Sequence, residues 1–250
     1  MNVRIYMLGT GAAIPINRGL PCIALKADSN IYLLDVGEGC QSRMFKTGLS
    51  PLKVKTVFIT HLHGDHYLGL FGLLQTMHLS NRKEALNIVA PRDLFNLIEK
   101  YMELRLMNID FQLNFVDVEE GREYSDEKIT VIPYPVAHSI PAHGFLVRAG
   151  KHVISYTGDT GPSSSTIEYS RNADILIHEA TFTSAMREEA HEQGHSTSGD
   201  AAMIASRAGV KLLVLTHISA RYSDENELYV DASRFHENVV VARDYMSLIL

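Results

Sequence analysis

Four side chains that bind divalent metal ions lie within six residues of the sequence. The apolar run Val57–Thr60 leads directly into His61, His63, Asp65 and His66. Imidazole and carboxylate groups suit zinc, manganese or iron(II), and no cysteine lies nearby to offer a soft ligand. One turn cannot easily wrap all four groups around a single ion, so the alternating histidines would serve one ion and the Asp65–His66 pair a second. The alternative is a solvated, histidine-rich turn.

Three further metal-binding side chains follow apolar runs later in the chain, where each run ends. They are His138, Asp159 and His217. A lone histidine in such a place is more often a satisfied core or surface residue. Because all three repeat one pattern after the first cluster, we interpret them as the remaining ligands of the same metal site.

Strand-like runs alternate with helical stretches along the chain and would position these ligands. The predicted strands are Val3–Leu8, Cys22–Ala27, Ile31–Asp35, Val54–Thr60, Leu86–Ala90, Phe111–Val116, Ile129–Val136, Gly144–Arg148, His152–Thr157, Ala173–His178, Lys211–Thr216 and Val239–Ala242. The predicted helices are Gly39–Thr47, His66–Leu79, Pro91–Leu106, Ser163–Arg171, Ser196–Ala208 and Glu225–His236. No internal repeat or linker is visible, so we expect residues 1–250 to form a single domain. The pattern predicts an α/β fold with helices covering sheets and function in the loops after strands.

Two of these helix starts carry specific signals. Pro91 fits the first position of its helix. Ser196 or Thr197 is a plausible N-cap, with Asp200 in the first turn that follows. These signals help to place the boundaries of elements that flank the candidate ligands.

Composition indicates an ordinary globular protein. The chain has 250 residues, 46% hydrophobic and 21% charged, which allows a large core. No apolar run is long enough to cross a bilayer, and residues 1–8 read as a strand instead of a signal peptide, so we expect a cytoplasmic protein with no membrane association. Cys22 and Cys40 form no CxxC pair, so we expect packing residues in a reducing compartment and no disulfide. The net charge of −6 argues against a protein coated in basic surface.

Longer segments spread over nearly the whole chain carry a family pattern. They are Leu8–Ala12, Asp35–Gly39 with Gln41, Thr60–His66, Ser155–Thr160, His178–Phe182, His195–Thr197 and Leu215–Tyr222. In this order they resemble the metallo-β-lactamase superfamily and, within it, ribonuclease Z, the tRNA 3′-processing endonuclease family. The first histidine cluster alone indicates only the superfamily, whereas residues 178–182, 195–197 and 215–222 are narrower signals.

This resemblance implies a four-layer αββα sandwich with two zinc ions at the edge between its sheets; Mn²⁺ or Fe²⁺ would also suit the ligands. It implies two ligand sets and a bridge: His61, His63 and His138 for one ion, Asp65, His66 and His217 for the other, and Asp159 with a hydroxide between them. Two ions suit hydrolysis of a phosphodiester, because they lower the pKa of the bridging water and clamp the attacking and leaving oxygens. The family also suggests that Asp65 orients the nucleophile.

The resemblance assigns a proton-handling pair as well. His195 matches the histidine that protonates the leaving oxygen or stabilises the charged phosphate, and Glu179 would orient it. The alternatives are a histidine that merely begins a helix and a surface acid. We expect His178 either to support a residue of the site or to be structural, and His191 to lie on the surface.

Three residues are candidate contacts to phosphate or tRNA, namely Arg18, Ser219 and Arg221. Arg18 lies in the segment Pro15–Arg18, which resembles the family's substrate loop. Arginine suits phosphate because its planar fork donates two hydrogen bonds. Solvated loop arginines are common, and that alternative stays open.

One feature of the family is missing. Many ribonuclease Z enzymes carry a long arm between the equivalents of His138 and Asp159, which grips the tRNA elbow. Here Ser139–Gly150 runs directly into the predicted strand His152–Thr157, and no Lys/Arg cluster obviously replaces the arm. Because phosphate contacts dominate nucleic-acid affinity, its loss should weaken tRNA binding.

We therefore predict a zinc-dependent endoribonuclease that removes the 3′ trailer of precursor tRNA through a metal-bound hydroxide, as a homodimer in keeping with the family. A hydrolase of small phosphodiesters with the same site is the close alternative. A non-catalytic metal- or nucleic-acid-binding scaffold is the alternative from another class. Diiron relatives would have Glu where His63 stands, and mRNA-processing relatives need an insertion between Asp159 and His217 for which this chain has no room.

Overall fold

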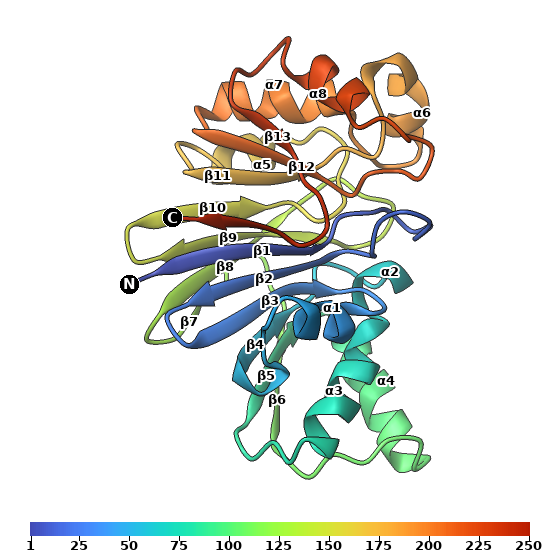
Figure 1. Cartoon of the computed structure of the whole chain (residues 1–250), viewed down its shortest axis with the longest axis vertical. Coiled ribbons are helices and arrows are strands. Elements are labelled where there is room, and N and C mark those ends of the chain that lie inside the picture. The colour runs from blue at the N-terminus through green and yellow to red at the C-terminus, as the bar shows by residue number, and fades with distance from the viewer. The chain divides into compact units, whose positions relative to one another are not determined.

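The structure, a computed structural model, describes residues 1–250 and divides into two compact units. The first unit contains Met1–Gly9, Gly19–Val118 and Asp244–Leu250, and the second contains Thr10–Arg18 and Glu119–Arg243. Each unit has its own seven-stranded mixed sheet with helices packed against it (Figure 1). Each sheet therefore positions its own part of the predicted site.

The sheet of the first unit has the strand order β14-β1-β2-β3-β4-β5-β6. Its strands are β1 (Val3–Gly9), β2 (Cys22–Ala27), β3 (Asn30–Val36), β4 (Val54–Phe58), β5 (Leu86–Ala90), β6 (Leu113–Asp117) and β14 (Met246–Ile249). The strands from β14 to β3 pair antiparallel, and those from β3 to β6 pair parallel. Parallel strands end at a common edge, which is where open α/β sheets bind ligands.

The helices of this unit cover the sheet with apolar faces. They are α1 (Cys40–Lys46), the 3₁₀ turn η1 (Pro51–Lys53), α2 (Gly64–Tyr67), α3 (Gly69–Leu79) and α4 (Arg92–Glu103). In α3 the buried residues Leu70, Leu73, Leu74 and Met77 follow helical spacing. They belong to one core cluster with the buried residues of β3, β4 and β5, so the helix is held by apolar packing.

The sheet of the second unit has the order β13-β12-β11-β10-β9-β8-β7. Its strands are β7 (Tyr124–Ser125), β8 (Ile129–Pro135), β9 (His143–Ala149), β10 (His152–Tyr156), β11 (Ile175–Glu179), β12 (Leu212–Thr216) and β13 (Val239–Val241). The strands from β7 to β10 pair antiparallel, and those from β10 to β13 pair parallel. Both sheets therefore share one layout, although the sequence shows no repeat, because strand pairing does not require matching residues.

Helices also cover the second sheet. They are α5 (Ser164–Tyr169), the 3₁₀ turn η2 (Ser184–Met186), α6 (Arg187–Glu192), α7 (Ser198–Ala208) and α8 (Asn226–Ala232). Figure 1 shows α7 and α8 beside β11, β12 and β13, with which they are in contact. Thr197 is the N-cap of α7 and forms a capping box with Asp200, which confirms one of the two predicted caps. None of the helices in the molecule has the length and apolar character needed to span a membrane.

Every predicted strand and helix is present, with differences at boundaries. Sequence reasoning missed β7, β14 and α6, and α4 begins at Arg92, one residue after Pro91. The predicted helix His66–Leu79 is two helices that meet at Leu68. The chain is tightly packed there: a Cβ on Gly69 would lie 2.1 Å from the carbonyl oxygen of Gly37, and a Cβ on Gly37 would lie 2.4 Å from that of Asp65. Glycine is therefore required where the turn that carries the predicted ligands Asp65 and His66 packs against the loop after β3.

The cysteines differ from expectation in one respect. Cys22 and Cys40 are completely buried, as packing residues would be, but a disulfide joins them. Our expectation of no disulfide is wrong for this structure. The two residues are neighbours because Gly37 donates a backbone hydrogen bond to Pro21, which draws the start of β2 to the start of α1.

Candidate active site

The first unit contributes its predicted ligands from the loop after β4 and from α2. His61 and His66 are completely buried, and His63 and Asp65 are partly buried. Nε2 of His61 lies 3.1 Å from Nδ1 of His63, and Nε2 of His66 lies 3.6 Å from Oδ2 of Asp65. Two nitrogen ligands of one tetrahedral zinc ion lie roughly 3.4 Å apart, given Zn–N bonds of about 2.1 Å. The separations in each pair therefore suit a shared ion.

Asp35 holds two of these histidines, although sequence reasoning gave it no role. Its carboxylate is buried, and its Oδ2 lies 2.8 Å from Nδ1 of His66. Its Oδ1 accepts the backbone N–H of Thr60 at 2.8 Å, and the Thr60 hydroxyl lies 2.9 Å from Nδ1 of His61. Asp35 also has a φ of 57°, which few non-glycine residues adopt. Its place at the end of the apolar run Ile31–Leu34 was the signal that could have identified it.

The second unit places Asp159 between two imidazoles. Asp159 is only 2% exposed. Nε2 of His217 lies 3.3 Å from its Oδ1, and Nε2 of His138 lies 4.0 Å from its Oδ2. One carboxylate with a different imidazole facing each of its oxygens has the donor arrangement of a bridge between two ions. The residues present therefore fit a two-metal centre.

The other ring nitrogen of most of these histidines is bonded to an oxygen of the protein. Nδ1 of His138 lies 2.9 Å from the carbonyl oxygen of Gly194, and Nδ1 of His217 lies 2.8 Å from the hydroxyl of Thr181. His61 and His66 use Nδ1 in the same way. Metal-binding histidines usually donate their second N–H to such an acceptor, which directs the remaining nitrogen to the ion.

Glu179 and His195 form the predicted pair. Glu179 is completely buried at the end of β11, and its Oε1 lies 2.8 Å from Nδ1 of His195. Backbone N–H groups of Thr160 and Thr181 donate to the two oxygens of Glu179. Burial alone would raise the pKa of Glu179, but the charge and the hydrogen bond of His195 outweigh burial and lower it. The carboxylate is therefore kept charged and fixes the orientation of the imidazole.

His195 lies beside His217, one of the predicted metal ligands. Their rings are stacked with centroids 5.5 Å apart, and the ligand atoms of Asp159, His195 and His217 all lie within 4.8 Å of one another. The His195 side chain is 17% exposed, so it can reach a bound molecule. The loop that carries it is anchored by the hydroxyl of Ser196, which donates to the carbonyl oxygen of Thr160 at 2.6 Å.

The two histidines expected to be less direct participants lie as predicted. His178 is completely buried, and its Nδ1 lies 2.7 Å from the carbonyl oxygen of Glu179. Burial lowers the pKa of His178 more strongly than nearby carboxylates raise it, so it is a neutral structural residue. His191 is exposed, and its Nε2 lies 2.9 Å from Oδ2 of Asp200.

The three candidate substrate contacts are held by protein groups. The Arg18 guanidinium donates to the Thr10 hydroxyl at 2.8 Å, the Ala242 carbonyl at 2.5 Å and the Glu225 carboxylate at 2.7 Å. Arg221 donates to the Ser219 hydroxyl at 3.1 Å and lies 4.4 Å from the centre of the Phe182 ring. Ser219 and Arg221 therefore form one hydrogen-bonded pair in which Arg221 is exposed, whereas Arg18 is anchored by three acceptors.

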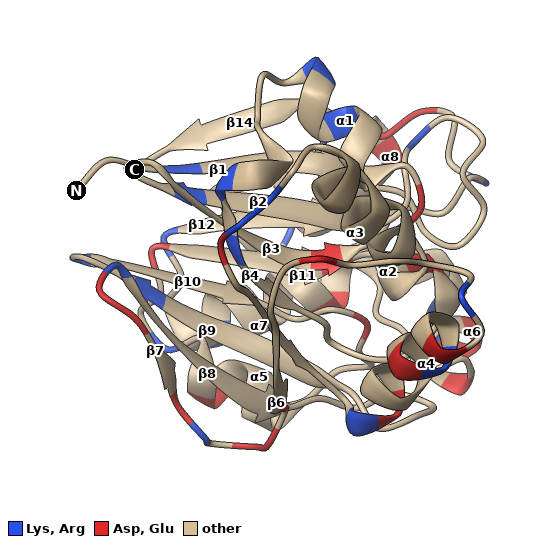
Figure 2. Cartoon of the chain, turned by 90° about the horizontal axis from the view of Figure 1, so that it is seen from below, with Lys and Arg blue, Asp and Glu red and all other residues tan.

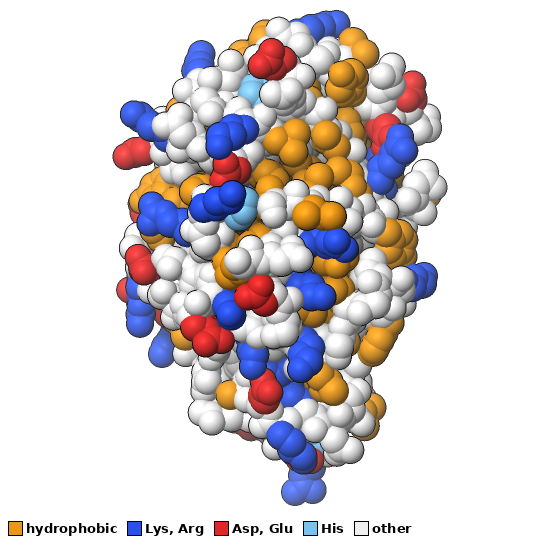
Figure 3. All heavy atoms as spheres, turned by 60° about the vertical axis from the view of Figure 1, so that its left-hand side comes forward, with side chains coloured by type: hydrophobic (Ala, Val, Ile, Leu, Met, Phe, Trp, Pro, Cys, Tyr) orange, Lys and Arg blue, Asp and Glu red, His pale blue; other side chains and the backbone are white.

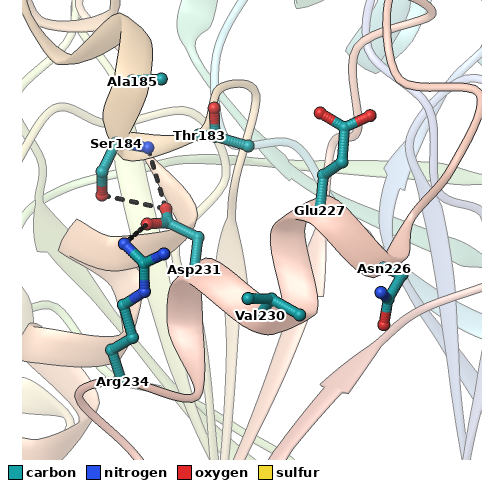
Figure 4. Close-up of a pocket in the computed structure, with 8 residues that line it drawn as sticks. All are labelled: Thr183, Ser184, Ala185, Asn226, Glu227, Val230, Asp231 and Arg234. Carbon is teal, nitrogen blue, oxygen red and sulfur yellow. Dashed lines mark hydrogen bonds and ion pairs between the residues drawn. The ribbon is translucent and has the colours of Figure 1, made fainter.

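Two surface pockets of the second unit differ in their relation to these residues. One of about 490 Å³ lies beside His138 and is lined by Ala137, His138, Ser139, Gly161, Pro162, His191, Glu192 and Gly194. Another, of about 620 Å³, is lined by residues of η2 and α8 and by no predicted site residue (Figure 4). In it the Asp231 carboxylate accepts hydrogen bonds from Ser184, Ser198 and Gly199, which ties α8 to η2 and to the start of α7. We therefore assign the pocket beside His138, and not the other one, to the candidate active site.

Comparison with known proteins identifies the class of this fold and site. A family model described as a beta-lactamase superfamily domain matches residues 32–218. The chain therefore belongs to the metallo-β-lactamase superfamily, which confirms the fold class expected from the sequence.

The narrower family follows from the relatives. The chain is 34% identical to a protein named ribonuclease Z from Sulfurisphaera tokodaii, with 96% of each chain covered. It is 36% identical to a ribonuclease Z from Methanococcus maripaludis, with 99% of this chain and 100% of that one covered. The crystal structure of the short form of human tRNase Z is 32% identical, with a TM-score of 0.84 and 98% of each chain covered. The chain is a member of the ribonuclease Z family, and the predicted class of enzyme, a metal-dependent hydrolase, is confirmed.

Proposed function

We propose that this chain is a zinc-dependent endoribonuclease that removes the 3′ trailer of precursor tRNA. The arrangement around two carboxylates of the second unit carries the proposal: Asp159 faces two imidazoles, and Glu179 holds a third beside them. Such an enzyme needs side chains that bind its ions, and it also needs a group that gives a proton to the leaving oxygen. The names of the relatives, ribonuclease Z and tRNase Z, support RNA, and tRNA in particular, as the substrate.

For the metal we propose two ligand sets and a bridge: His61, His63 and His138; Asp65, His66 and His217; and Asp159 between the ions. All donors are imidazole or carboxylate, which suits Zn²⁺, with Mn²⁺ or Fe²⁺ as further candidates. When bound, two such ions would lower the pKa of a water molecule. Their positive charge would also stabilise the attacking and leaving oxygens. Since neither unit has a complete set, we propose that the two units work as a single domain.

The proton steps fall to residues of the chain. Glu179 keeps the proton of His195 on Nδ1, at 2.8 Å from its carboxylate, so Nε2 is the atom we assign to the leaving oxygen. We assign Asp65 to the orientation of the attacking water, because its carboxylate can accept a hydrogen bond from it. His195 thereby acts from the side of the leaving group and Asp65 from the side of the nucleophile.

We propose that Arg18, Ser219 and Arg221 contact the phosphates of the substrate. Stacking on Phe182 restricts the motion of Arg221, so less conformational entropy is lost when the guanidinium binds a phosphate. Arg18 is already held by three acceptors. A phosphate contact from Arg18 would therefore use the donors that these bonds leave over.

Because the arm is missing, a second candidate function is the hydrolysis of small phosphodiesters. Between His138 and Asp159 the chain forms only the hairpin of β9 and β10. The alignment with the S. tokodaii protein runs over 287 positions, more than the 250 residues of this chain, so that relative has residues without a counterpart here.

The deciding experiment is cleavage of a 3′-extended precursor tRNA by the purified protein, with mature tRNA as a control. A single cut at the 3′ side of the acceptor stem supports the proposal. Hydrolysis of bis(p-nitrophenyl) phosphate without any tRNA cleavage would leave the small-phosphodiester function in its place.

We also propose that the protein is a homodimer and acts in the cytoplasm. A dimer could present substrate contacts from a second subunit, which would compensate for a missing arm. Sedimentation equilibrium at several protein concentrations measures the mass of the assembly and distinguishes a dimer from a monomer.

A further inference from the structure

Each unit contains a buried carboxylate that is connected to two histidines by hydrogen bonds. One histidine is bonded to the carboxylate directly, and the other is bonded through a threonine hydroxyl. In the second unit, Glu179 bonds His195 directly, and the Thr181 hydroxyl lies 2.7 Å from Glu179 and 2.8 Å from Nδ1 of His217. The first unit repeats this with Asp35, which bonds His66 directly and reaches His61 through Thr60.

The single hydrogen of the Thr181 hydroxyl determines the direction of these bonds. Both oxygens of Glu179 accept backbone N–H groups, at 2.9 Å from Thr160 and 3.2 Å from Thr181, so the carboxylate is an acceptor and the hydroxyl donates to it. Toward His217 the hydroxyl then offers only a lone pair, so Nδ1 of His217 must donate. A neutral imidazole with its proton on Nδ1 has its lone pair on Nε2, the atom 3.3 Å from Asp159.

The same argument from the single hydrogen of a hydroxyl applies to Thr60. Its hydroxyl lies 3.0 Å from both oxygens of Asp35, which also accepts the Thr60 backbone N–H. The hydroxyl therefore donates to Asp35 and accepts from Nδ1 of His61 at 2.9 Å. Nε2 of His61 is then the nitrogen directed to His63 and to the ion proposed between them.

We propose that Thr181 and Thr60 are positioning residues that hold His217 and His61 in the tautomer required for metal binding. The inference rests on the proposed function and its metal ligands, and it adds residues that touch neither ion nor substrate. Without the hydroxyl, the imidazole would also populate the form with its proton on Nε2, which cannot bind a metal through that atom. Loss of such supporting contacts weakens metal affinity by about 10- to 100-fold.

The test compares Thr181→Val, which has nearly the same shape but no hydroxyl, with Thr181→Ser, which keeps it. Nitrogen-15 NMR of the metal-free protein reports the tautomer of His217, and competition with a chromogenic chelator reports zinc affinity. We expect mostly Nδ1–H in the natural protein, a mixture in Thr181→Val with zinc binding at least about tenfold weaker, and recovery in Thr181→Ser. Thr60→Val should do the same to His61.

Thr166→Val is the matched control, because its hydroxyl is also buried but has no hydrogen-bond partner. It should leave tautomer and zinc affinity unchanged. Unaltered tautomer and affinity in Thr181→Val would overturn the proposal, as would an equal loss in Thr166→Val or no recovery in Thr181→Ser. Because the tautomer is measured without metal, it decides the proposal even if the natural protein proves to bind no zinc, an outcome that would instead refute the proposed function.

Discussion

At the scale of single residues, the carboxylate of Glu179 connects several residues of the candidate site. It accepts hydrogen bonds from the ring of His195, from two backbone N–H groups and from the Thr181 hydroxyl. A buried charge is stable only when it is bonded in this way. The same residue therefore orients His195, to which we assign the proton steps, and, through a hydroxyl, the candidate metal ligand His217.

Replacing His195 by Ala should remove the proton donor and leave the ions in place. General acid–base groups contribute about 10²- to 10⁴-fold to rate, so we expect turnover of precursor tRNA to fall by about that factor. Zinc content, measured by mass spectrometry on the same sample, should not change. Because the ligand atom of His195 lies within 4.8 Å of those of Asp159 and His217, loss of metal would show that His195 is itself a ligand.

Replacing Asp65 by Ala should reduce turnover and weaken the binding of one ion, because Asp65 pairs with His66 and is assigned to the attacking water. Steady-state cleavage rates and zinc stoichiometry measure both effects. Asp110→Ala is a suitable control, since its side chain is 75% exposed and outside the site. Unchanged turnover in Asp65→Ala would favour a non-catalytic scaffold.

At the scale of elements, the loop and helix after His195 depend on Asp200. This carboxylate closes the capping box of α7 with Thr197 and bonds the side chains of Arg187 and His191. Burial works to raise the pKa of Asp200, but its bonds to His191 and Thr197 outweigh it and hold the pKa below the usual range. The helix start is thereby stabilised by a charged group.

Asp200→Asn should lower the free energy of unfolding near neutral pH by about 1.5–3 kcal/mol, the usual value of a hydrogen bond to a charged group. A lowered folded-state pKa stabilises at pH values above the ordinary aspartate pKa, about 3.9, and that contribution is lost as the pH falls through the folded value. The difference between the natural protein and Asp200→Asn should therefore shrink below about pH 4. Urea unfolding between pH 7 and 3.5 tests this, and a difference that grows in acid would contradict it.

At the scale of the whole molecule, charge is mixed instead of segregated. The net charge is −6. Figure 2 shows basic and acidic residues together on α4 and α6, and on the face drawn in Figure 3 Lys and Arg are interspersed with acidic and apolar side chains. A nucleic-acid substrate would therefore meet few phosphate contacts, and its binding should depend on a small number of arginines.

Arg221→Ala should weaken binding of precursor tRNA and reduce the slope of log affinity against log salt by about one, the contribution of one phosphate contact. Filter binding at salt concentrations from about 50 to 200 mM measures the slope. Arg207→Ala, exposed at the opposite end of α7 from Thr197, is the matched control. Equal slopes for all three proteins would remove Arg221 from the substrate contacts.

Removal of metal should affect the whole chain, because the proposed ligands come from both units. A ligand that binds only the folded state stabilises it by mass action, so chelation should lower the melting temperature and abolish cleavage, and added zinc should restore both. Calorimetry with and without chelator provides the measurement. An unchanged melting temperature with full loss of activity would mean that the ions do not stabilise the folded chain.

The sequence by itself determined which side chains are candidate metal ligands and which strands and helices carry them. His61–His66, His138, Asp159 and His217 stand where apolar runs end, and both signals are local, since side-chain type and periodicity depend on neighbouring residues. Only the tertiary structure decided which ring nitrogen of His61, His66, His138 and His217 faces a protein oxygen, which groups Asp35, Thr60 and Thr181 contact, and that β14 pairs with β1. These follow from contacts between distant residues, such as His138 with Gly194, which local pattern cannot encode.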